Sequence, residues 1–297
     1  MTPVRHREIV LIGAGPASVS AALQLERLEQ DILMISPETG GCVRYARKLE
    51  NLAGFPGGIT GSAFHTRLRR QAQSLRIPRL PETVTRLDFR EGRFHARTDK
   101  SLVTANTMVV GTGTLPIRLD TPGEREAFDS GRIVHYSEDL KPLSPERVLI
   151  VGGGDVACDS ALALAEQGVR VRMVVRGGRM RALDSLLAQV KTITGISIEY
   201  SARPERILSD NNHITLQCRR DGESMAFTAE AILVAIGRRA NLDFLSRDFP
   251  FRETDRENRF FLVGDAAHPG HRQVAMAMGD GMRAAMEIVN SSKGACG

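Results

Sequence analysis

The sequence contains little cysteine and no tryptophan. Its 297 residues include four cysteines, no two of which are spaced as a CxxC pair. Isolated cysteines exclude the paired spacing of a zinc ribbon and argue against a secreted disulfide framework. The four thiols are Cys42, Cys158, Cys218 and Cys296.

Long apolar runs and basic runs interleaved with aromatics are also missing. No stretch reaches the roughly 18 apolar residues of a membrane span. Polar residues precede the first predicted strand, so we expect no signal peptide, a cytoplasmic location and no membrane partner. The absence of a basic run with interleaved aromatics argues against nucleic acid as a partner. His65, His268 and His271 lack metal-ligand spacing, so no metal is expected.

The composition is otherwise that of a globular protein. Hydrophobic residues make up 42% and charged residues 25%, and the length suffices for two domains. The formal net charge is +5, and most of the basic residues are arginine. This excess fits either a general preference for arginine codons or a basic face that steers an acidic protein partner.

A glycine-rich turn lies close to the N-terminus. The apolar run Ile9–Ile12 predicts a buried strand, and an alanine-rich helical pattern follows to about residue 30. Between them, Gly13 permits a tight turn, Gly15 lets the backbone approach a pyrophosphate, and Ser18 takes the third small position. Strand, turn and helix in this order predict a dinucleotide site at the N-terminus of the helix.

The strand that follows this helix ends on polar residues. Asp31–Ser36 predicts a second strand, and Glu38 comes two positions later. An acidic residue near this point of a dinucleotide fold binds a ribose hydroxyl. Ser36 and Glu38 are both candidates for this role.

A second glycine turn repeats the design. Val148–Leu164 has an apolar strand, three successive glycines at 152–154 and a helical pattern, which predicts a second nucleotide site. The following strand, Val169–Val175, leads into a loop with Arg176, Arg179 and Arg181 instead of an acid. Arginines here suit a 2′-phosphate, and the alternative is a solvated basic loop.

Further elements are expected along the chain. Alternating residues in the region 196–227 predict an antiparallel meander of four strands. The last seven residues, 291–297, are expected to be disordered. The remaining predictions are a helix over Ser62–Leu75, strands over Thr83–Leu87, Arg93–Arg97, Thr107–Val110, Ala231–Ile236 and Phe260–Val263, and a long final helix.

Seven motifs together give a family resemblance. They are GAGPAS at 13–18, ETGGCV at 38–43, ENLAGFPGGITG at 50–61, GTG at 111–113, GGGDVA at 152–157, AIGRRAN at 235–241 and VGDAAHPGHRQVA at 263–275. The chain resembles the low-molecular-weight thioredoxin reductase-like flavoproteins over nearly its full length. This implies an α/β fold of two Rossmann-like domains: an FAD domain at 1–117 and 243–297, and an inserted NAD(P)H domain at 118–242.

The resemblance also implies the cofactors and the residues that bind them. NADPH is expected, and NADH is possible because Gly177 replaces one arginine of the family pattern. Asp265 would hold the ribityl chain, and Arg272–Val274 would lie along the isoalloxazine at a helix N-terminus. The implied FAD residues are Gly13, Gly15, Pro16, Ala17, Ser36, Glu38, Gly41, Cys42, Asn51, Val84, Thr112, Gly113, Gly264, Asp265, Arg272, Gln273 and Val274. The implied NAD(P)H residues are Gly152, Gly154, Asp155, Val156, Ala157, Arg176, Arg181, Ile236 and Gly237.

One segment departs from the thioredoxin reductases. They carry a CxxC just before the second glycine loop, where this chain has the run 135–139 without cysteine, so no dithiol relay is expected there. In this respect the chain is similar to ferredoxin–NADP reductase-like and bacillithiol disulfide reductase-like proteins. His135 and Glu138 are candidate proton donors near the flavin, or simply linker residues.

Two cysteines leave alternatives open. Cys42 could form a thiolate or a mixed disulfide beside the flavin, or it could be a small filler on a turn. Cys296 could be a mobile shuttle thiol or part of an inert terminus.

The expected function is that of an FAD-dependent NAD(P)H oxidoreductase. Its acceptor would be a protein such as a ferredoxin or flavodoxin. The alternatives are direct reduction of a low-molecular-weight disulfide or other small substrate, and a non-catalytic flavin-binding protein. The final helix, with methionines at helical intervals, is expected to pack in the core or at a homodimer interface.

Overall fold

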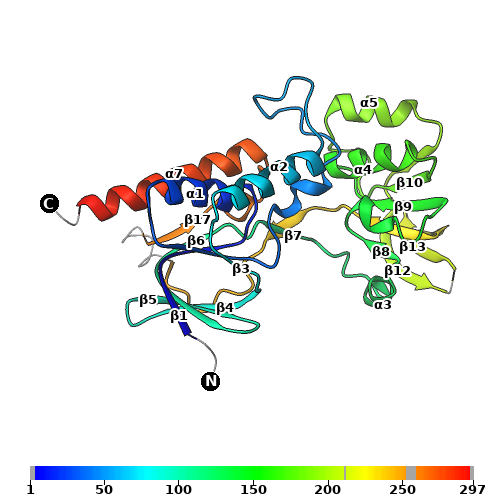
Figure 1. Ribbon diagram of the computed structural model, residues 1–297. Coiled ribbons are helices and arrows are strands. Elements are labelled where there is room, and N and C mark those ends of the chain that lie inside the picture. Colours follow the sequence, from blue (N-terminus) through cyan, green and yellow to red (C-terminus); the bar gives the residue numbers. More distant parts are fainter. Residues whose placement is uncertain (1–3, 211, 252–258, 295–297) are drawn as a thin grey trace. The chain divides into compact units, whose positions relative to one another are not determined.

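The computed structural model describes residues 4–210, 212–251 and 259–294. The chain divides into two compact units (Figure 1). Unit 1 comprises Met1–Leu115 and Arg239–Gly297, and unit 2 comprises Pro116–Arg238. Unit 1 is therefore built from both ends of the chain.

Unit 1 is organised around a seven-stranded sheet of order β3-β2-β1-β6-β5-β4, with β17 also paired to β6. Strands β3, β2, β1, β6 and β17 run parallel, whereas β4 and β5 add antiparallel pairs. The apolar runs of β1 and β2 are buried on both faces, as expected for parallel strands. The bounds are β1 (Val4–Ile12), β2 (Ile32–Ile35), β3 (Arg79–Leu80), β4 (Val84–Arg90), β5 (Arg93–Thr98), β6 (Leu102–Val110) and β17 (Phe260–Leu262).

Three helices complete the main frame of unit 1. Helices α1 (Pro16–Arg27) and α7 (Val274–Gly294) lie side by side, as Figure 1 shows. Helix α2 (Gly61–Ser74) buries Phe64, Leu68 and Ala72 at a spacing of four residues. Two short 3-10 turns are η1 (Gly41–Tyr45) and η3 (Gly264–Ala266).

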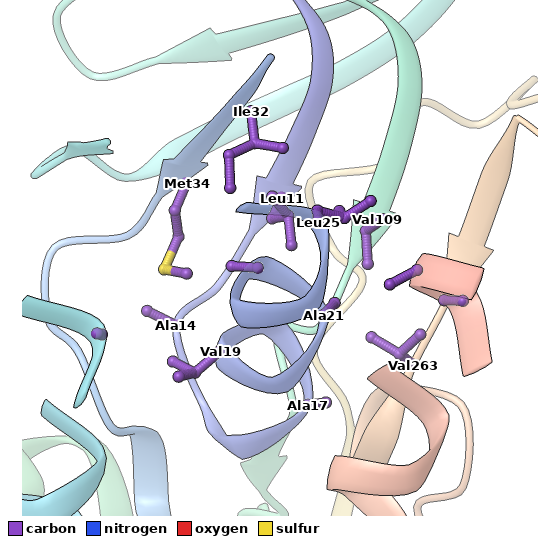
Figure 2. Close-up of a cluster of buried hydrophobic side chains, with 14 of the residues drawn as sticks. Leu11, Ala14, Ala17, Val19, Ala21, Leu25, Ile32, Met34, Val109 and Val263 are labelled. Carbon is purple, nitrogen blue, oxygen red and sulfur yellow. The ribbon is translucent and has the colours of Figure 1, made fainter. Parts of the chain in front are cut away.

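Small side chains let α1 approach its neighbours closely. Figure 2 shows Ala17, Ala21 and Leu25 of α1 in the buried cluster with Leu11 of β1 and Val109 of β6. Each of these side chains is at most 5% exposed. The alanine-rich sequence thus places the N-terminus of α1 at the carboxyl end of β1.

Unit 2 contains a five-stranded, wholly parallel sheet of order β11-β10-β9-β15-β8. A separate three-stranded antiparallel sheet consists of β12, β13 and β14. The strands of these two sheets are β8 (Ile133–Val134), β9 (Arg147–Val151), β10 (Arg170–Val174), β11 (Ile196–Glu199), β12 (Arg203–Ser209), β13 (Ile214–Arg220), β14 (Glu223–Ala229) and β15 (Ala231–Val234). The helices are α3 (Glu124–Asp129), α4 (Asp155–Ala165) and α5 (Asp184–Thr192), with the 3-10 turn η2 (Ser137–Leu140). A further two-stranded sheet pairs β7 (Thr114–Pro116) with β16 (Arg238–Ala240).

Two sequence predictions of local structure are wrong. The four-strand meander has only three strands, because β11 pairs in parallel with β10 in the main sheet. Strand β11 follows α5 after a short turn, so strand, helix and strand form a parallel crossover unit that alternation of residues cannot reveal. The expected disorder from residue 291 is also wrong in part, because α7 continues to Gly294. Cys296 lies outside the described residues.

No described helix combines the length and the hydropathy that crossing a membrane requires. Helix α7 leaves Met276, Met282 and Met286 between 42% and 46% exposed, whereas Ala284 and Ala285 of the same helix are buried. The exposed methionines therefore lie on the outer side of α7, where the sequence predicted a core or interface stripe.

Candidate functional site

The first glycine turn of unit 1 has a geometry that other residues cannot adopt. Gly13 has φ of +96°, and its N–H donates to the carbonyl of Ile35 at 2.9 Å. A Cβ on Gly13 would lie 2.5 Å from the carbonyl oxygen of Gly111. A side chain here would therefore push apart the ends of β1 and β6.

Helix α1 starts with its backbone donors open. Gly15 is the N-cap, in extended conformation and without a side-chain cap, and Pro16 follows at the first helical position. A Cβ on Gly15 would meet nothing within 4 Å. The hydroxyl of Ser18 is buried, has no partner among the described residues, and lies against Gly111. Open N–H groups and free space in front of Gly15 fit a bound pyrophosphate.

The η1 turn packs against this first loop. The N–H of Gly40 donates to the carbonyl of Ala14 at 2.6 Å, and a Cβ on Gly41 would lie 3.1 Å from Cα of Gly15. Beneath the turn, the His65 ring fills the space that a side chain on Gly40 would need. Burial lowers the pKa of His65. Cys42, on the same turn, is exposed.

The two ribose candidates both make local bonds. The Ser36 hydroxyl donates to the backbone carbonyl of Glu38 at 2.6 Å. The Glu38 carboxylate forms an ion pair with Arg44. The guanidinium of Arg79 donates to the carbonyls of Ser36 and Pro37 at 2.7 and 3.0 Å. The end of β2 is thus held in one conformation, with the Glu38 carboxylate 64% exposed beside a cation.

The final motif brings distant residues into unit 1. The Asn51 side-chain amide donates to the Gln273 side chain at 2.7 Å, across 222 residues of sequence. Gly264, which begins the η3 turn, comes so close to α1 that a Cβ there would lie 2.8 Å from Cβ of Ala17. Asp265 is half-buried in this turn, and Arg272 and Val274 are half-buried at the start of α7. The residues implied for the flavin are therefore arranged around the ends of α1 and α7.

Two other implied FAD residues, Thr112 and Gly113, follow the carboxyl end of β6. The Thr112 hydroxyl donates to the carbonyl of Asn241 at 2.7 Å, and the carbonyl of Gly113 accepts from the N–H of Asn241 at 3.0 Å. Val84, the first residue of β4, is half-buried. These contacts fix the GTG turn at the carboxyl end of β6.

Unit 2 repeats the geometry of the first turn. Gly152 has φ of +143°, and a Cβ on it would overlap the carbonyl oxygen of Ala235. Gly154 is an extended N-cap without a side-chain cap, and a Cβ there would meet nothing within 4 Å. Val156 is 47% exposed in the first turn of α4, and Ala157 is buried. The second loop therefore offers the same open helix N-terminus as the first.

The arginine loop is tied to this second turn by two hydrogen bonds. The N–H of Arg181 donates to the carbonyl of Gly153 at 2.7 Å, and the N–H of Leu183 donates to the Asp155 carboxylate at 2.8 Å. Arg176 and Arg181 are exposed, and neither forms an ion pair with a described acid. Their charge is thus available to an anionic ligand beside the open N-terminus of α4.

The remaining candidates of unit 2 form their own contacts. Nδ1 of His135 lies 3.2 Å from the carbonyl of Val234, and the centroids of the His135 and Phe128 rings lie 5.9 Å apart. Glu138 accepts from the Ser137 hydroxyl at 3.2 Å. Gly237 accepts from the N–H of Ile117 at 3.0 Å, and Ile236 is 39% exposed. His135 and Glu138 therefore lie at the carboxyl end of β8 and in the following turn.

Two cysteines are buried in the core. Burial raises the pKa of the Cys158 and Cys218 thiols to about 11. Both are therefore protonated at neutral pH and suited to packing. Cys42 is the exposed thiol among the described cysteines.

Comparison with known proteins identifies the family. The family model of the pyridine nucleotide-disulphide oxidoreductases matches residues 7–281. The chain belongs to this family. Among its relatives, thioredoxin reductase of Eremothecium gossypii is 27% identical over 308 residues, covering 95% of this chain and 97% of the relative. FAD and NADPH are the cofactors of the thioredoxin reductases in the family.

Solved structures agree with this fold. Thioredoxin reductase of Lactococcus lactis superposes with a TM-score of 0.86 at 22% identity, covering 96% of this chain and 98% of that one. Bacillithiol disulfide reductase of Bacillus cereus superposes with a TM-score of 0.79 at 19% identity, covering 97% and 100%. The predicted fold class, two Rossmann-like domains of the thioredoxin reductase type, is confirmed.

One residue of this family member, Asp280, was not found from the sequence. Asp280 is an acid within the apolar face of α7, and it accepts from the N–H of Gly264 at 3.1 Å and lies 3.3 Å from His268. It thereby holds the turn that contains Asp265. An acid between two glycines at 279–281 is the sequence signal that could have revealed Asp280.

Proposed function

We propose that this protein is an FAD-dependent oxidoreductase that oxidises NADPH and passes the electrons to an acidic acceptor protein. The observation that supports this most is that each unit contains one glycine turn, called a cradle below, with a first glycine at positive φ and an open helix N-terminus. Membership of the pyridine nucleotide-disulphide oxidoreductase family supports the same reaction class.

The residues present fit both cofactors. In unit 1, the turn from Gly13 to Ala17 would bind the pyrophosphate of FAD, and Asp265 would bind its ribityl chain. In unit 2, the turn from Gly152 to Ala157 would bind the pyrophosphate of NADPH, and the arginine loop would bind its 2′-phosphate. FAD, when bound, supplies the chemistry that accepts a hydride and releases single electrons or pairs.

The protein's own part is orientation and electrostatics. The amino end of α7 carries a positive partial charge, which would stabilise negative charge on a reduced flavin. Asn51 and Gln273 hold each other by a hydrogen bond at this end, so the flavin edge would meet a fixed surface. Asp155 orients the arginine loop through the N–H of Leu183.

We infer that the electrons leave without a dithiol relay. The described cysteines are single, and two of them are buried with raised pKa values. The run 135–139, where thioredoxin reductases have their pair, contains no cysteine. An acceptor would then have to approach the flavin itself.

The decisive experiment is anaerobic reduction of the bound flavin. The purified protein should be yellow, and NADPH should bleach it in a stopped-flow instrument faster than NADH does. A protein that takes up no FAD, or whose flavin is not reduced by either nucleotide, contradicts the proposal. Replacement of Arg176 by Ala should weaken the binding of NADPH more than the binding of NADH, because only NADPH carries the 2′-phosphate.

The exposure of Cys42 supports a second candidate function. A thiol on the exposed η1 turn could exchange with a low-molecular-weight disulfide beside the flavin. In that case Cys42→Ser should abolish NADPH-dependent reduction of a small disulfide. It should leave bleaching of the flavin by NADPH unchanged.

A further inference from the structure

The positive charge of this chain is concentrated in one segment. Between Glu38 and Glu82 lie eight Lys and Arg residues and a single acid, Glu50. This segment has a net charge of +7, whereas the whole chain has +5, so all other residues together carry −2. A general preference for arginine codons would spread the excess along the chain. The segment is called the basic segment below.

The basic segment folds as one local unit. The end of its η1 turn packs closely against the start of helix α2. The carbonyl oxygen of Ala46, the residue after η1, accepts the Gly61 N–H at 2.9 Å, and a Cβ on Gly61 would lie 2.6 Å from the same oxygen. Leu49 and Ile59 form an antiparallel bridge that closes the loop between them. Three of the eight cations, Arg67, Arg69 and Arg70, therefore lie together on α2, and Arg44 lies on the η1 turn that packs against this helix.

Several of these charges are uncompensated. Arg44 pairs with Glu38, and Lys48 pairs with Glu50 at 2.9 Å. On α2, by contrast, Arg67, Arg69 and Arg70 are exposed and form no ion pair with a described acid. Arg67 lies over the Phe55 ring, with 5.4 Å between its guanidinium carbon and the ring centroid. The outer face of α2 thus presents three cations that have no acidic partner among the described residues.

The other face of α2 is already used. Phe64 and Leu68 are 6% and 4% exposed in the core of unit 1. A helix that binds a bilayer needs a free apolar face, and α2 has none to offer. The basic segment also contains Cys42 and Asn51, two of the residues implied for the flavin edge. A cationic surface beside a redox centre is suited to a negatively charged redox partner.

From these observations we infer that the outer face of α2 is the docking surface for a small acidic electron-carrier protein. This inference rests on the proposed function and adds the location and the sign of the contact. Arg67, Arg69 and Arg70 would steer the carrier to the part of unit 1 that contains the implied flavin residues. Contacts of this kind act mainly on the association rate and weaken as salt rises.

The test compares two charge-reversal variants with the same change in net charge. The first is R67E/R69E/R70E on α2. The control is R90E/R93E/R97E on β4 and β5, where the three arginines are also exposed. The probes are an acidic plant-type ferredoxin and a flavodoxin as carriers, and a neutral benzoquinone as a small acceptor. Each is assayed with the FAD-loaded protein and NADPH, and binding of the oxidised carriers is measured separately by calorimetry.

At about 0.01 M salt, the α2 variant should reduce a carrier about tenfold or more slowly per unit concentration than the control variant. Its reduction of benzoquinone should match that of the wild type. The difference between the variants should nearly vanish at about 1 M salt, where charges are screened within about 3 Å.

Three results overturn the docking surface. The two variants could reduce and bind the carriers equally well. The wild type could reduce benzoquinone but neither reduce nor bind either carrier. A DNA duplex, and neither carrier, could bind the wild type and lose affinity in the α2 variant. Failure of the proposed function itself would be recognised separately, because NADPH would then reduce neither the flavin nor benzoquinone.

Discussion

The crossing of α1 and α7 provides a sharp test of the packing that shapes the FAD cradle. Gly281 of α7 faces the backbone of α1: a Cβ there would lie 2.9 Å from the carbonyl carbon of Ala17 and 3.1 Å from the nitrogen of Ala21, and it would overlap the Ala17 oxygen. Ordinary contacts of a Cβ begin near 3.4 Å. Both neighbours are helix backbone, so neither can rotate away. The substitution Gly281→Ala must therefore push the two helices apart.

Gly279 supplies a matched control in the same helix. A Cβ on Gly279 would meet nothing within 4 Å, and neither glycine has a positive φ. Alanine in an open helical position gains roughly 0.5–1 kcal/mol over glycine. Overpacking costs about 1–3 kcal/mol, and a clash with rigid backbone belongs at the upper end. We expect Gly281→Ala to destabilise unit 1 by about 2 kcal/mol net, and Gly279→Ala to stabilise it.

Thermal unfolding of the two variants, followed by circular dichroism, should separate these effects. At about 2–4 °C per kcal/mol, Gly281→Ala should lower Tm by roughly 4–8 °C and Gly279→Ala should raise it by about 1–4 °C. FAD affinity should fall only in the Gly281 variant, because Ala17 lies in the cradle. Equal Tm shifts of the same sign in both variants would refute the close approach of α1 and α7.

Three further predictions concern unit 2. Burial raises the pKa of the Cys158 and Cys218 thiols to about 11, so both should resist alkylation by iodoacetamide at pH 8 until the protein is denatured. Peptide mass spectrometry can measure this, and ready alkylation of either thiol in the native protein would contradict their burial. Burial alone would raise the pKa of Glu230, but hydrogen bonds from the side chain and backbone of Arg147 outweigh it, so the pKa is lowered from its ordinary value of 4.5. The stability that this carboxylate contributes is therefore present above pH 4.5 and lost as pH falls through the lowered pKa. Glu230→Gln should lower the unfolding free energy by about 1–3 kcal/mol at pH 7 and by progressively less in acid. A difference between variant and wild type in urea unfolding that does not change with pH would contradict this role of Glu230. Asp155→Ala should weaken the affinity for NADPH several-fold and the affinity for NADH less, as nucleotide titration can measure. The reason is that the arginine loop loses the hydrogen bond from the Leu183 N–H to Asp155 that holds it against α4.

The sequence was most informative where backbone geometry restricts the residue type. Gly13 and Gly152 need a positive φ and space for a neighbouring carbonyl, so their positions in the chain identify both cradles. Strands β1 and β9 were recognised because each ends in a short apolar run that leads into one of these turns. Local requirements of this kind are visible in a few consecutive residues.

Other features depend on contacts between distant parts of the chain. The parallel pairing of β11 follows from the crossover through α5, and the local alternation of residues suggested the opposite. The bond from Gly264 to Asp280 and the bond from Asn51 to Gln273 span 16 and 222 residues. No periodicity or motif gives such pairs. These bonds position the candidate flavin residues, which explains why the sequence indicated the residues but not the contacts that hold them.

The difference between the two cradles lies in the charges that follow the second strand of each unit. After β2, Glu38 provides a carboxylate whose charge is shared with Arg44, and a carboxylate suits a ribose with free hydroxyls. After β10, Arg176, Arg179 and Arg181 provide cations that have no described acidic partner, and cations suit a 2′-phosphate. The glycine turns themselves are alike, so they cannot distinguish FAD from NADPH. We infer that the selectivity of each unit comes from these few charged residues, and that exchanging their sign in unit 2 would change the preferred nucleotide while leaving the cradle intact.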